Sequence, residues 1–365
     1  MKKLFFIAAM AGAALVSCTK NEGAEALEQQ DVITFAEPVT ALNTKAVEIG
    51  ENYPASQNFS VFAHYYTAAE GGYTTFAGGD LYMDNVVTKY NPAIHGWDPK
   101  EGSGVNYYWP KQGTLTFAAY SPSNIAVNYD KEGIHFPDYA VDVDCEKQID
   151  LLYSERSYDQ TKDMMVTNAP YNGVQIKFNH ALSSILFTVR TDADYDDDNF
   201  TIVLKKLSIK NVNSKANFNQ GLVDANGEVT KPVADHFGWD GHSDPKEYIA
   251  YNDSQVLTTA QSYTDNISVT NPRMNDIQNT NLILLPQRFV DQHLYIEYQI
   301  VNNNVNPATV VDQTATFNLG SYGPSWERGK RYVYNLTFGF DKIYFDPVVT
   351  EWDEVVLTPD IALGR

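Results

Sequence analysis

Short runs in which apolar and polar residues alternate recur along the whole chain, and this feature constrains the fold most strongly. Gly, Asn, Asp and Pro bound these runs, as is typical of strands joined by turns. The chain also holds 24 Tyr and 18 Phe, residue types that favour strands. No long amphipathic helix and no internal repeat of roughly 20–50 residues accompanies the runs. We therefore predict an all-β fold, with strands at 59–63, 115–120, 184–189 and 294–298.

The first 18 residues have the pattern of a bacterial lipoprotein signal. Lys2 and Lys3 precede an apolar run at 4–16, which is too short to span a bilayer in a mature protein. The run ends in Leu-Val-Ser followed by Cys18, the order that a lipoprotein peptidase recognises. We expect residues 1–17 to be removed and Cys18 to carry lipid such as palmitate, in the cell outer membrane. The alternative is an ordinary secretory signal that a cysteine happens to follow.

Charge and cysteine content exclude several classes of partner and fold. The formal net charge is −20, and removal of 1–17 takes away two lysines and no acid, which gives −22. Because a phosphate backbone is bound by clustered Lys and Arg, we expect no nucleic-acid partner. Cys18 and Cys145 are the two cysteines, so acylation of the first leaves no intramolecular disulfide. We expect Cys145 to be a small buried apolar residue.

A search for catalytic and metal-binding motifs in the sequence is negative. The seven histidines are scattered, with no close metal-ligand spacing, and no nucleotide-binding or serine-hydrolase motif is present. We predict no enzyme activity, no catalytic residue, no metal and no cofactor. A glycoside hydrolase stays open as an alternative, because it needs only two carboxylates that the fold brings together.

One acidic segment, Asp192 to Asp198, has two interpretations. Hard cations such as calcium favour several carboxylates, but the segment lacks the glycine and the closing glutamate of an EF-hand loop. Asp197 occupies the position of the EF-hand glycine, and Val203 occupies the position of the closing glutamate. A solvated turn between strands is the simpler interpretation.

A cluster of aromatic residues also has two interpretations. Trp97, Tyr107, Tyr108 and Trp109 concentrate flat apolar rings in a short region. On the surface such rings could stack against sugars, as in a glycan-binding lipoprotein. In a β-sandwich they more often fill the core.

Several segments follow the lipoprotein signal in a fixed order and span most of the chain. They lie at 32–35, 44–46, 107–110, 115–122, 178–182, 282–287, 326–334 and 343–348. In the order and spacing of these segments the chain resembles the fimbrillin family, the lipoprotein precursors of type V pilins and of related tip or anchor subunits.

This resemblance implies two transthyretin-like Greek-key β-sandwich domains in tandem. We expect a signal peptide at 1–17, a propeptide at 18–45, an N-terminal domain at 46–172 and a C-terminal domain at 173–365. A stretch rich in Asp, Gly, Asn and Pro from 224 to 253 is predicted to be a long loop of the second domain.

The resemblance also implies partners and a maturation step. A trypsin-like protease would cut after Lys45, which leaves Ala46 as the new N-terminus and releases the precursor from the outer membrane. The partners would be other pilin subunits in an extracellular fimbria, and an adhesion ligand on host or bacterial cells. Many relatives have Arg at the cut, so Lys45 requires a protease that tolerates lysine. The alternative is a linker lysine that is never cut.

The propeptide itself contains a short apolar strand, with Val32, Ile33, Phe35 and Val39 as its apolar residues. Such a strand can fill a groove as a plug, and its removal exposes a sheet edge with unpaired backbone groups. Three or four side chains at about 1.5–3 kcal/mol each make a gross term of about 5–12 kcal/mol. A strand from another subunit can take its place by β-strand addition, which is donor-strand exchange.

The candidate donor strand is the segment 353–365, with Val355, Leu357, Ile361 and Leu363 as its pocket residues. Pro359 cannot donate to a strand ladder, so the segment would be two short strands or one broken strand. Head-to-tail contacts of this kind build an open filament, as a stalk subunit requires. If the segment is instead the last strand of the second domain, the chain is a tip subunit.

The lipid attachment site yields a direct prediction. The Cys18→Ala precursor should keep residues 1–17 and take up no labelled palmitate, because the acylated thiol is missing. Mass spectrometry of the N-terminus and palmitate labelling in cells check both points. A Cys145→Ala variant serves as the control and should be processed and labelled normally.

Overall fold

The computed structural model describes residues 32–40, 53–69, 71–73, 75–165, 173–192, 199–221, 238–257, 267–268, 282–339 and 342–352. The chain is nearly all β, with mostly antiparallel strand pairs, which confirms the predicted fold class. The tandem arrangement of two transthyretin-like domains stays a prediction. Among the described residues, no helix is both long and apolar enough to cross a membrane.

The chain forms two compact units, each built from several segments of sequence. Unit 1 comprises Met1–Glu37, Val61–Phe117 and Ser157–Ile176. Unit 2 comprises Pro38–Ser60, Ala118–Arg156 and Lys177–Arg365. The predicted division at 46–172 and 173–365 stays a prediction.

One sheet has the strand order β1-β10-β8-β5-β2-β3-β4, with β9 also paired to β5. Short helices η1 (Phe76–Gly78), α2 (Pro99–Ser103) and η3 (Lys162–Met164) connect its strands. The strands are β1 (Val39–Thr40), β2 (Phe59–Tyr66), β3 (Asp80–Asn91), β4 (Gly96–Asp98), β5 (Thr114–Ser121), β8 (Leu152–Ser154), β9 (Ser157–Gln160) and β10 (Lys177–His180).

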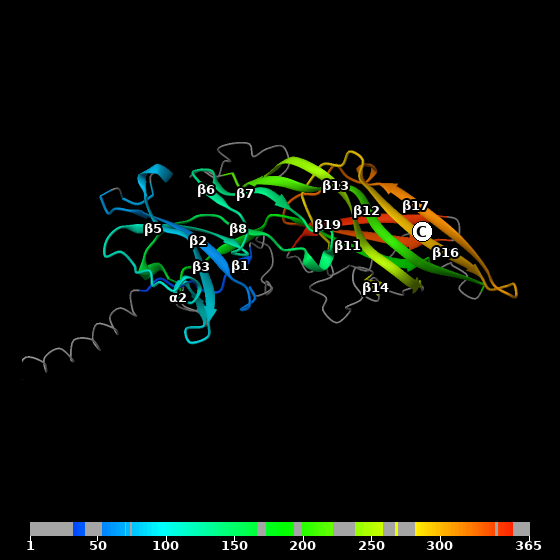
Figure 1. Ribbon diagram of the computed structural model, residues 1–365, viewed down its shortest axis with the longest axis horizontal. Helices are drawn as coiled ribbons and strands as arrows, with labels where there is room; N and C mark the ends of the chain where they lie inside the picture. Colours follow the sequence, from blue (N-terminus) through cyan, green and yellow to red (C-terminus); the bar gives the residue numbers. More distant parts are fainter. Residues whose placement is uncertain are drawn as a thin grey trace, which may run out of the picture. The chain divides into compact units, whose positions relative to one another are not determined.

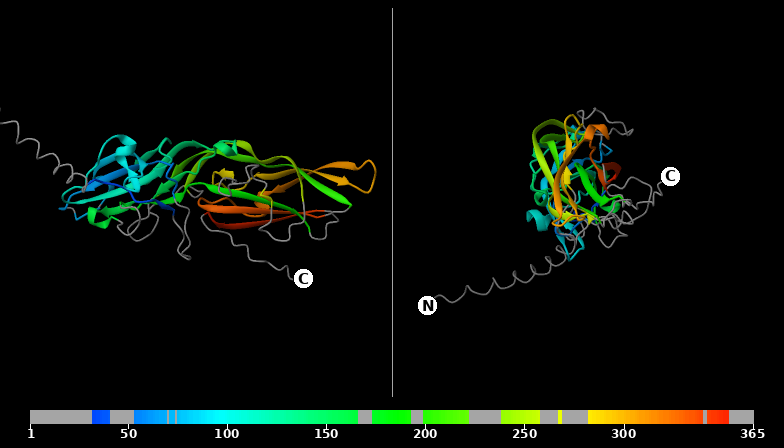
Figure 2. Two further views of the ribbon diagram at one scale, coloured as in Figure 1. Left: turned by 90° about the horizontal axis from the view of Figure 1, so that it is seen from below. Right: turned by 90° about the vertical axis from the view of Figure 1, so that its right-hand side faces the viewer.

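Unit 2 contains two further sheets, which Figure 2 shows as separate layers. The six-stranded sheet has β6 (Asn128–Asp130), β7 (Gly133–Ala140), β12 (Phe200–Asn219), β13 (Trp239–Val256), β16 (His293–Asn302) and β17 (Thr309–Asn318). The five-stranded sheet has β11 (Ser183–Thr191), β14 (Ile267–Ser268), β15 (Leu282–Leu284), β18 (Lys330–Phe338) and β19 (Ile343–Glu351). Two more short helices are η2 (Cys145–Lys147) and η6 (Leu319–Ser321).

Aromatic side chains fill the core of unit 2. The Tyr298 and Phe338 rings pack at 5.1 Å between centroids and the Phe317 and Phe345 rings at 5.2 Å, so each pair joins strands of the two sheets. Trp239 is fully buried, and its indole N–H donates to the Ala181 carbonyl at 2.7 Å. Buried indoles need such a partner, and this bond fixes the start of β13 in the core.

The four strands predicted from alternating runs are present as β2, β5, β11 and β16. The long loop predicted at 224–253 is wrong for 239–253, which belong to the 18-residue strand β13. This strand pairs with β12 through several register shifts and contains Pro245 and a left-handed Asp244. Its buried residues are few, with Trp239 and Tyr248 among them, so the sequence lacks a clear alternation.

Cys145 is half-buried at the start of η2, so the prediction of a buried apolar residue is wrong. Burial raises the pKa of its thiol, and the neighbouring Asp144 and Glu146 carboxylates raise it further. The Asp144 side chain caps the turn, since it accepts from the Glu146 N–H at 3.1 Å, and the Asp142 side chain accepts from the Asp144 N–H at 2.9 Å.

The Trp239 contacts yield a stability prediction. Trp239→Ala should lower the free energy of unfolding by about 3–5 kcal/mol, because it leaves a cavity and an unpaired carbonyl. Chemical denaturation checks the change. Val290→Ala is the control, since Val290 is 84% exposed and its loss should cost less than about 0.5 kcal/mol. Equal effects for the two variants would contradict the role given to Trp239.

Candidate functional site

The candidate site is the segment 32–37, called here the N-terminal strand, together with the residues of unit 1 that hold it. The strand is drawn dark blue in Figure 1. Along one edge, the Ile33 N–H donates to the Tyr107 carbonyl at 2.8 Å. Phe35 and Trp97 exchange two backbone hydrogen bonds, each 2.9 Å long. This reciprocal pair is typical of antiparallel strands.

The other edge of the N-terminal strand is bonded as well. The Val174 N–H donates to the Thr34 carbonyl at 2.8 Å, and the Ala36 N–H donates to the Val174 carbonyl at 3.1 Å. The Gln175 side-chain amide donates to the Glu37 carbonyl at 2.6 Å. The segment is therefore an interior strand of unit 1, held on both edges.

Side-chain burial follows the alternation expected of a strand. Ile33 and Phe35 have 0% exposure, whereas Thr34 between them is half-buried. The Phe35 ring packs edge-on against the Phe117 ring, with 5.6 Å between centroids. The Trp109 ring also packs edge-on against Phe117, with 6.0 Å between centroids. The N-terminal strand thus supplies side chains to the aromatic core of unit 1.

The predicted plug residues differ in burial. Val32 is half-buried and forms a bridge with Tyr108, while Val39 is 44% exposed. Val39 lies in β1, which pairs in parallel with β10 in unit 2. Two fully buried side chains give a gross term of about 3–6 kcal/mol, which is mostly below the range of about 5–12 kcal/mol expected from the sequence.

The hairpin of β3 and β4 explains why an edge is available for the N-terminal strand. Trp97 pairs with Tyr90 of β3 on one side, which leaves its second backbone edge for Phe35. β4 is only three residues long, because Asp98 caps helix α2 by accepting from the Lys100 N–H at 2.8 Å. The strand therefore ends at the point where Trp97 can face Phe35.

Gly173 is a residue of the site that the sequence did not reveal. A β-carbon at this position would lie 2.6 Å from the Ala36 nitrogen and 2.6 Å from the Phe35 carbonyl carbon. It would also lie 2.7 Å from the Thr34 oxygen. From sequence this glycine marked a domain boundary, although glycine beside a strand can equally indicate close backbone approach. Glycine here permits the N-terminal strand to sit in the sheet.

One titratable group of the N-terminal strand has a shifted pKa. Burial raises the pKa of Glu37 above its ordinary value of 4.5, because the charged form loses solvation. A carboxyl with a raised pKa binds its proton more tightly in the folded state. Its contribution therefore favours the seated strand at low pH and declines as pH rises through the raised value.

The proposed sugar-stacking platform is not supported by the burial of its tryptophans. Trp97 is 1% exposed and Trp109 is 6% exposed, because their rings pack on Tyr90 and Phe117. Tyr107 and Tyr108 are half-buried and lie beside the N-terminal strand. The Trp109 indole nitrogen is buried with no hydrogen-bond partner among the described residues. Trp97, Tyr107 and Tyr108 thus flank the position that the N-terminal strand occupies, which is called the groove below.

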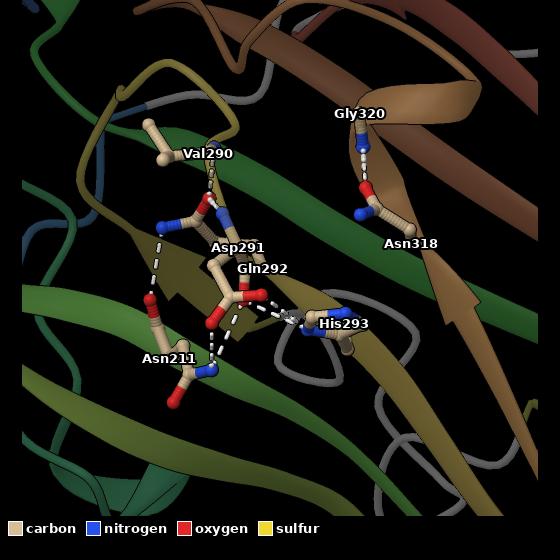
Figure 3. A network of polar contacts seen from close by, with 7 residues as sticks. All are labelled: Asn211, Val290, Asp291, Gln292, His293, Asn318 and Gly320. Carbon is tan, nitrogen blue, oxygen red and sulfur yellow. Dashed lines mark hydrogen bonds and ion pairs between the residues drawn. The ribbon is translucent and has the colours of Figure 1, made fainter.

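A second group of linked polar side chains lies in unit 2 (Figure 3). The Gln292 side chain accepts from the Val290 N–H at 2.7 Å and donates to the Asn211 carbonyl at 2.9 Å. Asn211 in turn donates to the Asp291 carboxylate at 3.0 Å. The first bond lies within the loop before β16, and the two bonds of Asn211 tie that loop to strand β12, so the network is structural.

Several predicted residues lie outside the described part of the chain. They are Cys18, Lys45, Ala46, Val355, Leu357, Ile361 and Leu363. Asp192 is described, and its N–H donates to the Phe338 carbonyl at 2.8 Å, but 193–198 are not. Within the described ranges, no group of three His, Cys, Asp or Glu residues could hold a metal ion.

Comparison with known proteins points to one family. A model of the fimbrillin-like family matches residues 44–352. A crystal structure of a fimbrial protein from Bacteroides vulgatus is 18% identical with a TM-score of 0.59, and the match covers 88% of this chain and 99% of that one. A candidate cell adhesion protein from Bacteroides uniformis is 14% identical with a TM-score of 0.47, and covers 88% and 98%. Among curated protein sequences, none matches the chain.

The close approach at Gly173 yields a prediction that depends on the N-terminal strand. Gly173→Ala should destabilise the full precursor by about 1–3 kcal/mol, because the new methyl group overlaps the backbone at 34–36. In a protein cut after Lys45 and freed of residues 18–45, the same substitution should cost less, because the overlap is gone and only the strain of a side chain at a φ of +156° remains. Thermal unfolding of both forms checks this.

Gly323→Ala is the matched control for this prediction. No atom lies within 4 Å of a β-carbon at Gly323, so the substitution should leave both forms unchanged. If Gly173→Ala destabilises the cut form as much as the precursor, the glycine serves some contact other than the N-terminal strand.

Proposed function

The chain belongs to the fimbrillin-like family, and on that premise we propose that it is a structural subunit of a type V-like fimbria with a role in cell adhesion. In this proposal it is exported as a lipoprotein, cut after Lys45 and polymerised by strand exchange. The observation that carries the proposal is the N-terminal strand, an interior strand of unit 1 that precedes the expected cut.

Cleavage after Lys45 would turn an integral strand into a separate peptide. The N-terminal strand lies within 18–45, so a cut at 45 leaves it held by non-covalent contacts, chiefly its backbone hydrogen bonds and the buried Ile33 and Phe35 side chains. Its departure would expose the backbone edges of Trp97 and Val174 and the two apolar pockets. Such an edge is a template for another strand.

A second subunit can fill the vacated position by β-strand addition. Backbone hydrogen bonds supply affinity and alternating pockets supply specificity in this mode of recognition. The donor we propose is the segment 353–365 of a neighbouring copy. A donor at one end and a groove at the other make a heterologous contact, which propagates as an open filament.

The same cut would also release the subunit from the membrane. Cys18 and Lys45 bound the propeptide, so one cleavage removes the lipid and frees the groove together. The propeptide contains one other basic residue, Lys20. A cut at Lys20 would remove the lipid and leave the N-terminal strand in place.

The protease of this proposal is a trypsin-like enzyme that accepts lysine. An incorporated subunit would serve as stalk, or as tip if its segment 353–365 stays with its own fold, and adhesion would involve a ligand on host or bacterial cells. The alternative of a glycan-binding lipoprotein is less well supported, since the Trp97 and Trp109 rings that would stack on sugars are buried.

Proteolysis of the purified precursor tests the proposal. Trypsin should make a discrete cut after Lys45, and electron microscopy should then show polymers. The Lys45→Ala precursor should keep its N-terminal strand and stay monomeric, even when it is cut at Lys20. Lys111→Ala, at an exposed lysine of unit 1, should behave like the unaltered protein. Polymers from uncut protein, or none after removal of 18–45, would contradict the proposal.

A further inference from the structure

We propose that the donor segment occupies the groove in one register, with Ile361 at the position of Ile33 and Leu363 at the position of Phe35. This inference rests on the proposed function, because it names which residues of a second copy replace the N-terminal strand. It follows from the hydrogen bonds and burial of the strand that is seated there now.

Backbone donors restrict where a proline can stand. The N–H groups at positions 33, 35 and 36 each donate to a carbonyl of the groove. At position 37 the described residues show no hydrogen bond from the Glu37 N–H, and position 38 is already Pro38. Because proline has no N–H, a donor with Pro359 at 33, 35 or 36 would lose a ladder bond.

Burial adds three requirements on side chains. Positions 33 and 35 are fully buried, so they need apolar residues two apart, and a carboxylate there would be an unpaired buried charge. Position 36 holds Ala36 at 1% exposure, so it needs a small apolar residue. Position 34 is half-buried and tolerant.

Two registers of 353–365 place apolar residues at both pockets without a proline at 33, 35 or 36. One sets Val355 and Leu357 in the pockets, which puts Thr358 at the buried position 36. A branched side chain with a hydroxyl would be both oversized and unsatisfied there. The other sets Ile361 and Leu363 in the pockets and Gly364 at position 36. The second register meets every requirement.

The tether between subunits also favours the second register. Trp352 is fixed in unit 2, since its N–H donates to the Gly329 carbonyl at 2.9 Å and its ring stacks on His180 at 4.3 Å. Ile361 lies nine residues beyond this point, a reach of about 30 Å in an extended chain. Val355 lies three residues beyond, a reach of about 10 Å. The longer tether lets the donor reach a groove on a separate molecule.

Engineered disulfides can measure the register. Val32 and Tyr108 lie directly opposite each other in an antiparallel bridge, so cysteines at these two positions are close enough to form a disulfide. Both side chains are half-buried. In the proposed register Asp360 takes the position of Val32. In the other register, with Val355 and Leu357 in the pockets, Glu354 takes the position of Val32.

The experiment uses full-length precursors with Cys145→Ser and Tyr108→Cys, cut after Lys45 and assembled under oxidising conditions. Asp360→Cys should give covalent oligomers on a non-reducing gel, in an excess on the order of tenfold over Glu354→Cys. An uncut precursor with Val32→Cys and Tyr108→Cys is the positive control and should form an intrachain disulfide.

Three other outcomes would contradict the register, the contact between subunits or the proposed function. Covalent oligomers from Glu354→Cys, or assembly with neither disulfide, would reject the register and leave strand exchange standing. A disulfide confined to monomers would show that the segment fills the groove of its own chain. Failure of the unaltered cut protein to associate would instead refute the proposed function.

A second pair of variants tests the register without cysteines. Gly364→Val should block assembly, because position 36 admits only a small residue. Ala362→Val should assemble normally, because it occupies the half-buried position 34. Normal assembly of Gly364→Val would contradict the register.

Discussion

The architecture of unit 1 depends on the N-terminal strand at 32–37. This strand is hydrogen-bonded on both edges, although it lies near the start of the sequence and its partners lie far along the chain. Phe35 exchanges two backbone bonds with Trp97, and Val174 bonds to Thr34 and Ala36 across the strand. The bonds involve backbone atoms, so another strand of suitable side chains can make them equally well. The buried Ile33 and Phe35 then decide which sequences fit.

Several features of unit 1 are consistent with this arrangement. Gly173 has no side chain where the strand backbone passes, and β4 stops after three residues, which leaves the second edge of Trp97 available. The tryptophans that could have formed a sugar-binding surface instead line the groove. An interior strand of this kind contributes to the fold of unit 1, and in the proposed assembly a strand from another subunit would restore the same contacts.

The sequence predicts β11 and β16 where buried and half-buried residues alternate with the pleat of the strand. β2 and β5 are buried on both faces, so the turn residues that bound their apolar runs identify them more clearly than alternation does. The sequence pattern fails at β13, whose buried residues are too few to show a period. In the N-terminal strand it indicates Ile33 and Phe35 but overestimates Val39, which is exposed in β1. It does not reveal Gly173, Trp97 or Val174 as groove residues, because the partners of a strand edge are set by long-range pairing that local pattern does not encode.

Hydrogen exchange at the Trp97 and Val174 amides tests the central claim most directly, since these groups donate to the N-terminal strand. The account predicts slow exchange in the precursor, faster exchange once residues 18–45 have been cut away and removed, and slow exchange again in the assembled filament. The β12 amides provide internal references in the same sample, because β12 pairs with β7, β13 and β16, which all lie outside 18–45. Equal protection of Trp97 and Val174 with and without the N-terminal segment would contradict the account.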